Sequence, residues 1–196
     1  MSKNFLLLLF AILSFTINSH GKAKTFISEG SLDGLKNAPT SMVIEFDYSQ
    51  TVCDGMMLQS VVDNGGMADW KYLSEKAEKN FLKKLKKETK KLKIDFADTL
   101  NSYDYKMKIS VTQIDFGNAA SGILLGGKNG GCSISATIAV YSLSTGNKIC
   151  TITVNHLKGF GKPKFGFGSS KSQRMDSVYS FLADDLARIF KRSRKH

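Results

Sequence analysis

The stretch that decides the fold lies at residues 42–48 and reads Met-Val-Ile-Glu-Phe-Asp-Tyr. Its apolar and polar side chains alternate, so that Met42, Ile44 and Phe46 share one face and Glu45 lies on the other. A period of two residues is typical of a strand with one buried face. We therefore expect a β-sheet that is covered on one side only.

The period changes after this strand, because apolar residues recur every three or four positions between residues 69 and 92. This spacing predicts an amphipathic helix, and Asp69 is placed to cap its first turn. A similar stripe predicts a second helix near the C-terminus. Its buried residues are expected to be Val178, Phe181, Leu182, Leu186, Ile189 and Phe190. The glycine-containing stretch before the first helix is expected to be a loop, with room for one short helix around residues 56–62.

Three more stretches alternate like the first, at residues 106–112, 133–141 and 150–155. The last two are expected to form a hairpin around the Ser-Thr-Gly-Asn sequence at residues 144–147. The predicted order of elements is therefore β-α-β-β-β-α. We predict an α+β two-layer sandwich, in which two helices cover one face of a four-stranded mixed sheet and the other face stays polar.

The N-terminus has the layout of a signal peptide. Lys3 precedes an unbroken apolar-rich run at residues 5–17, and small and polar residues follow it. The run has 13 residues, whereas a membrane-spanning helix needs about 20. We therefore predict a signal peptide at residues 1–23, a single domain at 24–190 and a basic tail at 191–196. The alternative is that the run is a core helix of the mature fold.

The chain is basic, with a formal net charge of +11. A positive surface attracts polyanions, and export argues against nucleic acid as the partner. The most conspicuous source of this charge is a lysine cluster on the predicted helix at residues 69–92, which suits docking on anionic lipid or glycan. The candidate polyanion-binding residues are Lys83, Lys84, Lys86, Lys87, Lys90 and Lys91. The alternative is a solvated face that keeps the protein soluble.

Three cysteines leave at least one thiol unpaired in an oxidising compartment. Cys53 follows the first predicted strand and Cys132 begins the third, so both are expected at the same end of the sheet. We predict a disulfide between them. Cys150 is expected to be a small buried apolar residue. The alternative that all three cysteines are free thiols stays open.

Residues suited to catalysis are few and scattered. The stretch at residues 122–129 approaches a phosphate-binding P-loop, but Asn129 stands where that motif has a magnesium-binding hydroxyl. His156 has no acidic neighbour in the sequence, and no Cys or His spacing fits a metal site. Asp115, Asp184 and Asp185 are interpreted as isolated caps or solvated charges. We therefore expect no enzymatic activity, cofactor or metal.

Three short motifs lie at the boundaries of the predicted elements. The first strand ends in Phe-Asp-Tyr-Ser, the second ends in Ile-Asp-Phe-Gly, and Gly-Gly-Cys precedes the hairpin. With their surroundings, at residues 43–49, 105–117 and 130–159, they resemble uncharacterised exported proteins of Bacteroides-type Gram-negative bacteria. The element order is also loosely similar to that of small envelope accessory domains. The resemblance implies an exported protein that acts by binding, and it supplies no catalytic residues.

These observations favour a periplasmic or secreted binding or accessory protein of unknown partner. The expected binding surfaces are the polar sheet face, a sheet edge, or the glycine-rich loops at residues 117–131 and 159–168. A peripheral protein that binds anionic lipid or glycan through the lysine-rich helix is the alternative. An enzyme is a third hypothesis, and it requires acids or His156 to converge in a pocket.

Overall fold

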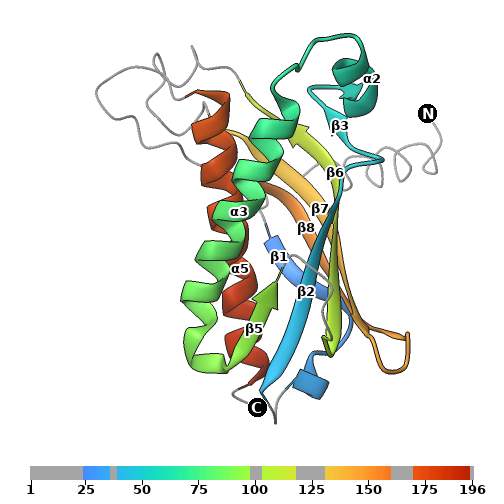
Figure 1. Cartoon of the computed structure of the whole chain (residues 1–196), viewed down its shortest axis with the longest axis vertical. Coiled ribbons are helices and arrows are strands. Elements are labelled where there is room, and N and C mark those ends of the chain that lie inside the picture. Colours follow the sequence, from blue (N-terminus) through green and yellow to red (C-terminus); the bar gives the residue numbers. More distant parts are fainter. Residues whose placement is uncertain (1–23, 36–38, 98–102, 118–130, 160–169, 195–196) are drawn as a thin grey trace, which may run out of the picture.

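The computed structural model describes residues 24–35, 39–97, 103–117, 131–159 and 170–194. Within these ranges the chain forms one eight-stranded mixed sheet and three α-helices (Figure 1). The strands are β1 (Lys24–Gly30), β2 (Thr40–Asp47), β3 (Val52–Cys53), β4 (Met56–Met57), β5 (Ile94–Ala97), β6 (Tyr105–Asp115), β7 (Ser133–Ser142) and β8 (Lys148–Lys158). The helices are α2 (Leu58–Asp63), α3 (Trp70–Thr89) and α5 (Lys171–Ser193), with short 3-10 helices η1 (Asp33–Leu35) and η2 (Lys90–Leu92).

The strand order across the sheet is β1-β8-β7-β6-β2-β5, and the short β3 pairs with β6 and β4. β2 runs parallel to both of its neighbours, β5 and β6. The pairs β6–β7, β7–β8 and β8–β1 are antiparallel. β5 and β6 are consecutive in the chain but lie on opposite sides of β2.

The predicted four-stranded sheet with two helices is wrong, because the described residues form eight strands and three helices. β1 follows directly on the predicted signal peptide, and its sequence, Lys-Thr-Phe-Ile-Ser-Glu-Gly, shows no clear alternation. β5 has four residues and β3 and β4 have two each, which is too short for a periodic pattern to stand out. The stretch expected to be a loop contains β3 and β4, and α2 lies close to the short helix considered around residues 56–62.

The two long helices lie side by side along one face of the sheet (Figure 1). α3 buries Leu73, Ala77, Phe81 and Leu85, and α5 buries Met175, Val178, Leu182, Leu186 and Phe190. These side chains meet the apolar residues of the central strands, among them Met107, Ile109, Ile138 and Ile152, which are fully buried. This one core lies between the helices and the sheet.

The two long helices begin differently. At the start of α5, Ser170 and Gln173 form a capping box, in which each side chain accepts a hydrogen bond from the backbone N–H of the other. At the start of α3, Asp69 makes no capping hydrogen bond through its side chain, so the predicted cap is wrong. Phe181 also departs from the predicted buried stripe of α5, because 38% of its surface is exposed.

The two ends of the chain bear differently on the predicted boundaries. The predicted signal peptide at residues 1–23 lies outside the described residues. None of the described helices is both long enough and apolar enough to span a bilayer. α5 continues to Ser193, so the predicted basic tail begins inside this helix. Arg194 then donates hydrogen bonds to the carbonyl of Leu92 and to the hydroxyl of Thr40.

Candidate functional site

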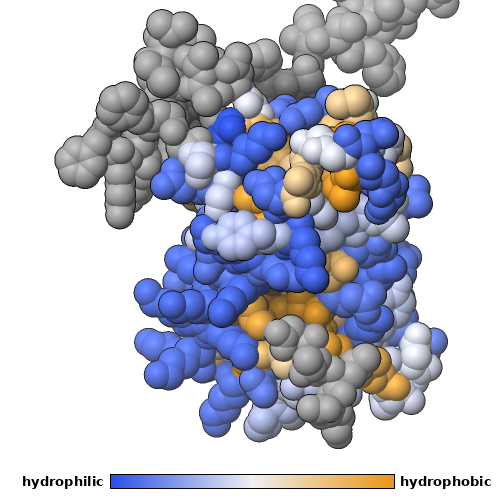
Figure 2. All heavy atoms as spheres, turned by 45° about the horizontal axis from the view of Figure 1, so that its top comes forward, coloured by the Kyte–Doolittle hydropathy of each residue, from blue (hydrophilic) through white to orange (hydrophobic). Residues whose placement is uncertain are grey.

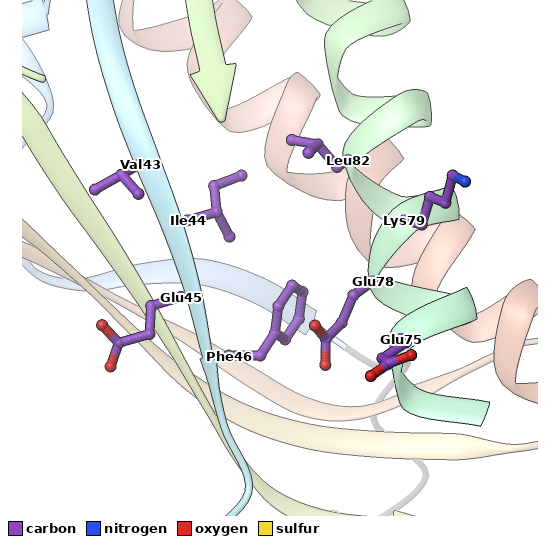
Figure 3. Close-up of a pocket in the computed structure, with 8 residues that line it drawn as sticks. All are labelled: Val43, Ile44, Glu45, Phe46, Glu75, Glu78, Lys79 and Leu82. Carbon is purple, nitrogen blue, oxygen red and sulfur yellow. The ribbon is translucent and has the colours of Figure 1, made fainter. Parts of the chain in front are cut away.

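A groove of about 600 Å³ lies between strand β2 and helix α3. Its lining residues are Val43, Ile44, Glu45 and Phe46 from β2, and Glu75, Glu78, Lys79 and Leu82 from α3 (Figure 3). Figure 2 shows a hollow with an apolar floor on the drawn face, bordered by hydrophilic residues. The groove exists because β5 is short, so that α3 faces β2 directly beyond the end of β5.

One edge of β2 has no strand partner along this groove among the described residues, and we call residues 44–47 the unpaired half of β2. β5 pairs only with the first half of β2, at Thr40–Val43, whereas β6 pairs on the other side as far as Asp47. Thr40 donates its N–H to Lys93, on the β5 side. Because backbone groups alternate in direction along a strand, those of Phe46 also point to the β5 side. No described strand pairs with Phe46 on that side, so its N–H and C=O face the groove.

The floor and walls of the groove differ in polarity. Ile44 and Phe46 from β2 and Leu82 from α3 provide apolar surface. Figure 3 shows Glu78 pointing from α3 toward Phe46, whereas Lys79 points away from β2. The α3 wall that faces the strand edge is therefore acidic, although the whole chain is strongly basic.

A hydrogen-bonded chain of three side chains leads from the groove into the core. The Tyr48 hydroxyl donates to the Glu78 carboxylate and contacts the Tyr179 hydroxyl at 2.7 Å. Either hydroxyl can be the donor in the contact between Tyr48 and Tyr179. Burial raises the pKa of both tyrosines, so both stay protonated at neutral pH.

Glu78 is the partly buried acid of the groove. Burial raises the pKa of Glu78, the hydrogen bond from Tyr48 lowers it, and the charge of Glu75 raises it again. No ion pair joins Glu78 to a cation among the described residues. Glu75, in contrast, is largely exposed and has Lys71 at 3.9 Å. A carboxylate that loses water without gaining a cation favours an incoming positive group.

Aromatic packing fixes the strand side of the groove. The Phe46 ring meets Phe81 edge-on at a centroid distance of 5.3 Å and lies 5.7 Å from the Tyr179 ring. Tyr48 meets Trp70 edge-on at 5.1 Å. These contacts anchor the unpaired half of β2 to both long helices. These contacts and the pairing with β6 therefore hold the strand extended, although no described strand pairs with its groove side.

The opposite face of the same strand is polar and internally neutralised. Glu45 forms an ion pair with Lys106, and Asp47 forms one with Lys108 at 2.8 Å. The hydrogen bond from Lys108 holds the pKa of Asp47 well below its usual range. Among the acids that line the groove, Glu78 on the α3 side is thus the one without a cation partner in the described residues.

The predicted polyanion-binding lysines lie on the C-terminal half of α3 and on η2. Lys83, Lys86, Lys87, Lys90 and Lys91 are exposed and form no ion pair among the described residues. Lys84 differs, because it is half-buried and pairs with Asp184 at 3.1 Å and with Glu88 at 3.4 Å. The structure therefore groups five of the six predicted lysines on one exposed surface and ties the sixth to α5.

The three cysteines are buried free thiols. Cys53 pairs in the sheet with Ile114 of β6, and Cys132 immediately precedes β7 on the far side of β6. Strands two positions apart are separated by roughly 9.5 Å, whereas the Cα atoms of a disulfide lie within about 7 Å. Burial raises the pKa of Cys53 and of Cys150 to about 11. The predicted Cys53–Cys132 disulfide stays a prediction, and the strand between the two thiols argues against it.

The residues considered for catalysis do not converge in the described part of the chain. Asp184 pairs with Lys84, Asp115 accepts from the N–H of Gly117, and His156 lies 3.5 Å from the Ser133 hydroxyl. No metal-binding group of acids, histidines and cysteines occurs among the described residues. The P-loop-like stretch at residues 122–129 lies outside them.

Sequence reasoning missed the groove. It named a sheet edge as one binding surface but did not identify which edge. Tyr48 and Glu78 are thirty positions apart in the chain, and only the packing of α3 on β2 brings them together. The one available signal was the pair Glu75 and Glu78, which interrupts a lysine-rich helix close to its apolar stripe.

The fold and the groove define a small protein with a mixed sheet, one helical layer and one half-paired internal strand. No protein-family model matches the chain, and no curated protein matches it. Among solved structures it is similar to the PelC dodecamer from Paraburkholderia phytofirmans in two crystal forms. In space group P6 the identity is 14%, the match covers 86% of this chain and 98% of that chain, and the TM-score is 0.45. In space group C2, with a PelC variant, these values are 12%, 85%, 96% and 0.44.

A further solved structure, of an uncharacterized protein, is 13% identical. That match covers 79% of this chain and 94% of the other, with a TM-score of 0.41. All three similarities are too weak to bear on function.

Proposed function

We propose that this chain is a non-enzymatic, exported binding or accessory protein, which takes up an extended segment of a partner at the free edge of β2. The single observation that carries this proposal is the unpaired half of β2 beside an open groove. An extended segment placed there continues the line of β5 and gains main-chain hydrogen bonds, as in other cases of strand addition.

The β2 edge suits strand addition better than the other outer edge of the sheet. β1 carries a bulge between Ile27 and Glu29, which breaks the regular spacing of its outer edge. It ends at Gly30, whose φ is +69° and where a Cβ would lie 2.1 Å from the Ile149 oxygen. β2 pairs with β6 without any register shift. Its free half therefore presents a straight template.

A matched pair of variants tests the proposal. Phe46→Pro removes the ring and the groove-facing N–H, whereas Phe46→Val removes the ring and keeps the N–H. The probes are blocked heptapeptides that alternate threonine and valine, with lysine, norleucine or glutamate at the centre. Titration is followed by NMR on the labelled protein.

We expect at least one probe to slow hydrogen exchange of the Phe46 amide in the wild type. The Val variant should still bind that probe, and the Pro variant should bind it at least about tenfold more weakly, because one main-chain hydrogen bond and the strand geometry are lost. If no probe protects the Phe46 amide, or if the two variants bind equally, strand addition at β2 is wrong.

Export is tested on the protein from its native cell. Mass spectrometry is expected to show a chain that lacks the first 21 or 23 residues. A chain that still begins at Met1 would contradict the proposal of export. The same spectrum, taken after alkylation in denaturant, counts the free thiols and so tests the predicted Cys53–Cys132 bond.

The exposed lysines support a second candidate, a peripheral protein that binds anionic lipid or glycan. The observation that favours it is that the five exposed lysines form no ion pair with any described residue. Vesicles with an anionic lipid fraction, vesicles of neutral lipid and heparin serve as probes. Binding that falls with salt and with Lys86→Gln plus Lys90→Gln supports this candidate. Binding that is absent or independent of salt excludes it.

A further inference from the structure

We infer that the segment bound at the β2 edge carries a lysine or arginine side chain on the face that meets α3, and that Glu78 recognises it. This inference rests on the proposed function, because it specifies the partner of the same groove. It commits to one occupant, an extended basic peptide segment of another protein.

Geometry determines which side chains of the bound strand meet α3. Successive side chains of a strand point to opposite faces of the sheet. Those on one face of the bound segment lie between β2 and α3, over Ile44, Phe46 and Leu82. Those on the other face join the polar side of the sheet, beside Glu45. A segment that alternates apolar or basic residues with polar ones therefore fits both faces.

Charge complementarity identifies the basic residue. Glu75 and Glu78 both line the groove, and Glu78 is the more buried of the two (Figure 3). Lys79 points away from the strand edge, and Glu45 already has Lys106 as its partner. Glu78 is therefore the lining carboxylate that is partly desolvated and has no cation among the described residues. A cationic side chain beside Phe46 fills that position.

The hydrogen bonds around Glu78 orient it for this role. Tyr48 donates to the carboxylate from the core side, and Tyr179 fixes Tyr48 in turn. The remaining acceptor positions of the carboxylate are free to face the groove. A charge-assisted hydrogen bond from a lysine or arginine is stronger than one between neutral groups. The Glu78 carboxylate thus favours a positively charged side chain over a neutral one of the same shape.

The three heptapeptides test this inference separately from strand addition. Lysine and norleucine have side chains of nearly the same shape and differ in charge. We expect the lysine peptide to bind the wild type about five- to tenfold more tightly than the norleucine peptide, and the glutamate peptide to bind most weakly. Equal binding of the lysine and norleucine peptides, with protection of the Phe46 amide, would overturn this inference and leave strand addition intact.

Two further variants locate the recognition. Glu78→Gln keeps the acceptor for Tyr48 and removes the charge, so it should abolish the preference for lysine over norleucine. Glu75→Gln is the matched control and should retain most of that preference, because Glu75 is exposed and has Lys71 nearby. If the preference survives Glu78→Gln, the cation is read elsewhere and the assignment to Glu78 is wrong.

Two solution measurements complete the test. Lowering the pH from 7 to 4 should remove the lysine preference of the wild type, because the raised pKa of Glu78 makes it protonate early.

Sedimentation of the protein alone examines the competing occupant, a second copy of the chain. A dimer that dissociates in the Phe46→Pro variant but not in Phe46→Val would overturn the proposal of a foreign basic segment.

Discussion

The two halves of strand β2 belong to one uninterrupted strand but have different surroundings. The first half, at Thr40–Val43, has β5 on one side and β6 on the other. The second half has β6 on one side and a groove on the other. Both halves direct apolar side chains toward the helices, since Met42 is fully buried and Ile44 is nearly so. One neighbouring strand and side-chain packing therefore suffice to fix the second half of β2, while its other edge has no described strand partner.

The largest expected effect tests the paired half. Phe96 of β5 is fully buried and its ring lies 5.8 Å from that of Phe190. Phe96→Ala should lower the free energy of unfolding by about 3–5 kcal/mol, because it leaves a cavity in the core. Chemical denaturation measures this loss. Phe26→Ala is the control, since Phe26 is 42% exposed on β1. Similar losses in both variants would show that β5 is not part of the packed sheet.

Hydrogen exchange compares the two halves directly. The N–H of Met42 points to β5 and is paired, whereas the N–H of Phe46 points into the groove. We expect the Phe46 amide to exchange at least about 100-fold faster than the Met42 amide. The Met42 amide can exchange only when the structure opens, whereas the Phe46 amide already faces the groove. NMR exchange at one pH measures both rates, corrected for intrinsic exchange. Equal protection of the two amides would mean that the edge is already covered in the free protein.

A smaller effect concerns the acid beside the free half. Because burial raises the pKa of Glu78 above its usual 4.5, the folded state binds a proton more tightly than the unfolded state. Its contribution to stability is present below pH 4.5 and is lost as the pH rises through the folded pKa. The free energy of unfolding of Glu78→Gln should therefore equal that of the wild type at pH 7 or exceed it by less than about 1 kcal/mol. This advantage should disappear at pH 4.

Denaturation of Glu78→Gln and Glu75→Gln at pH 4, 5.5 and 7 checks this sign. The Glu75 variant should show no comparable change with pH, because Glu75 is exposed. Should Glu78→Gln be clearly less stable than the wild type at pH 7, a cation must already neutralise Glu78, and the basis of the lysine preference would be removed.

The smallest effect compares one acid at each half of β2. Lys108 lowers the pKa of Asp47, and the backbone N–H of Ser41 lowers the pKa of Asp104. Each adds stability above its usual pKa of 3.8 that is lost as the pH falls below that value. Asp47→Asn and Asp104→Asn should each cost about 0.5 kcal/mol or less at pH 7. The cost should shrink as the pH falls from 4 to 2, and a cost that does not change over this range would assign it to shape and not to charge.

The sequence predicts individual elements well where a pattern is long, and poorly where it is short. The alternation around Ile44 and Phe46 identifies a half-buried strand, and the helical stripe that contains Phe81 identifies α3. The four residues of β5 are too few to show such a pattern. The left-handed φ of 52° at Lys93, which separates β5 from η2, is likewise not visible in the sequence. Without β5, neither the full sheet nor its incomplete pairing with β2 can be foreseen.

The candidate site depends on the same missing information. The lysine cluster is visible as a run of letters, and five of its six predicted residues are exposed as a group. The groove is not visible, because its carboxylate and its strand edge come from distant segments. The partly buried state of Glu78 also depends on Tyr48, which lies at the end of another element. Such properties arise only when the tertiary structure forms.

The place of β2 between β5 and β6 also constrains how the molecule is made. Thr40 pairs with Ile94, and Met42 pairs with Tyr105, so the partners of β2 lie more than fifty positions further along the chain. During synthesis β2 must wait, with both edges bare, until those later segments arrive. Closing such long loops delays productive collapse. We therefore expect the sheet around β2 to complete late in folding.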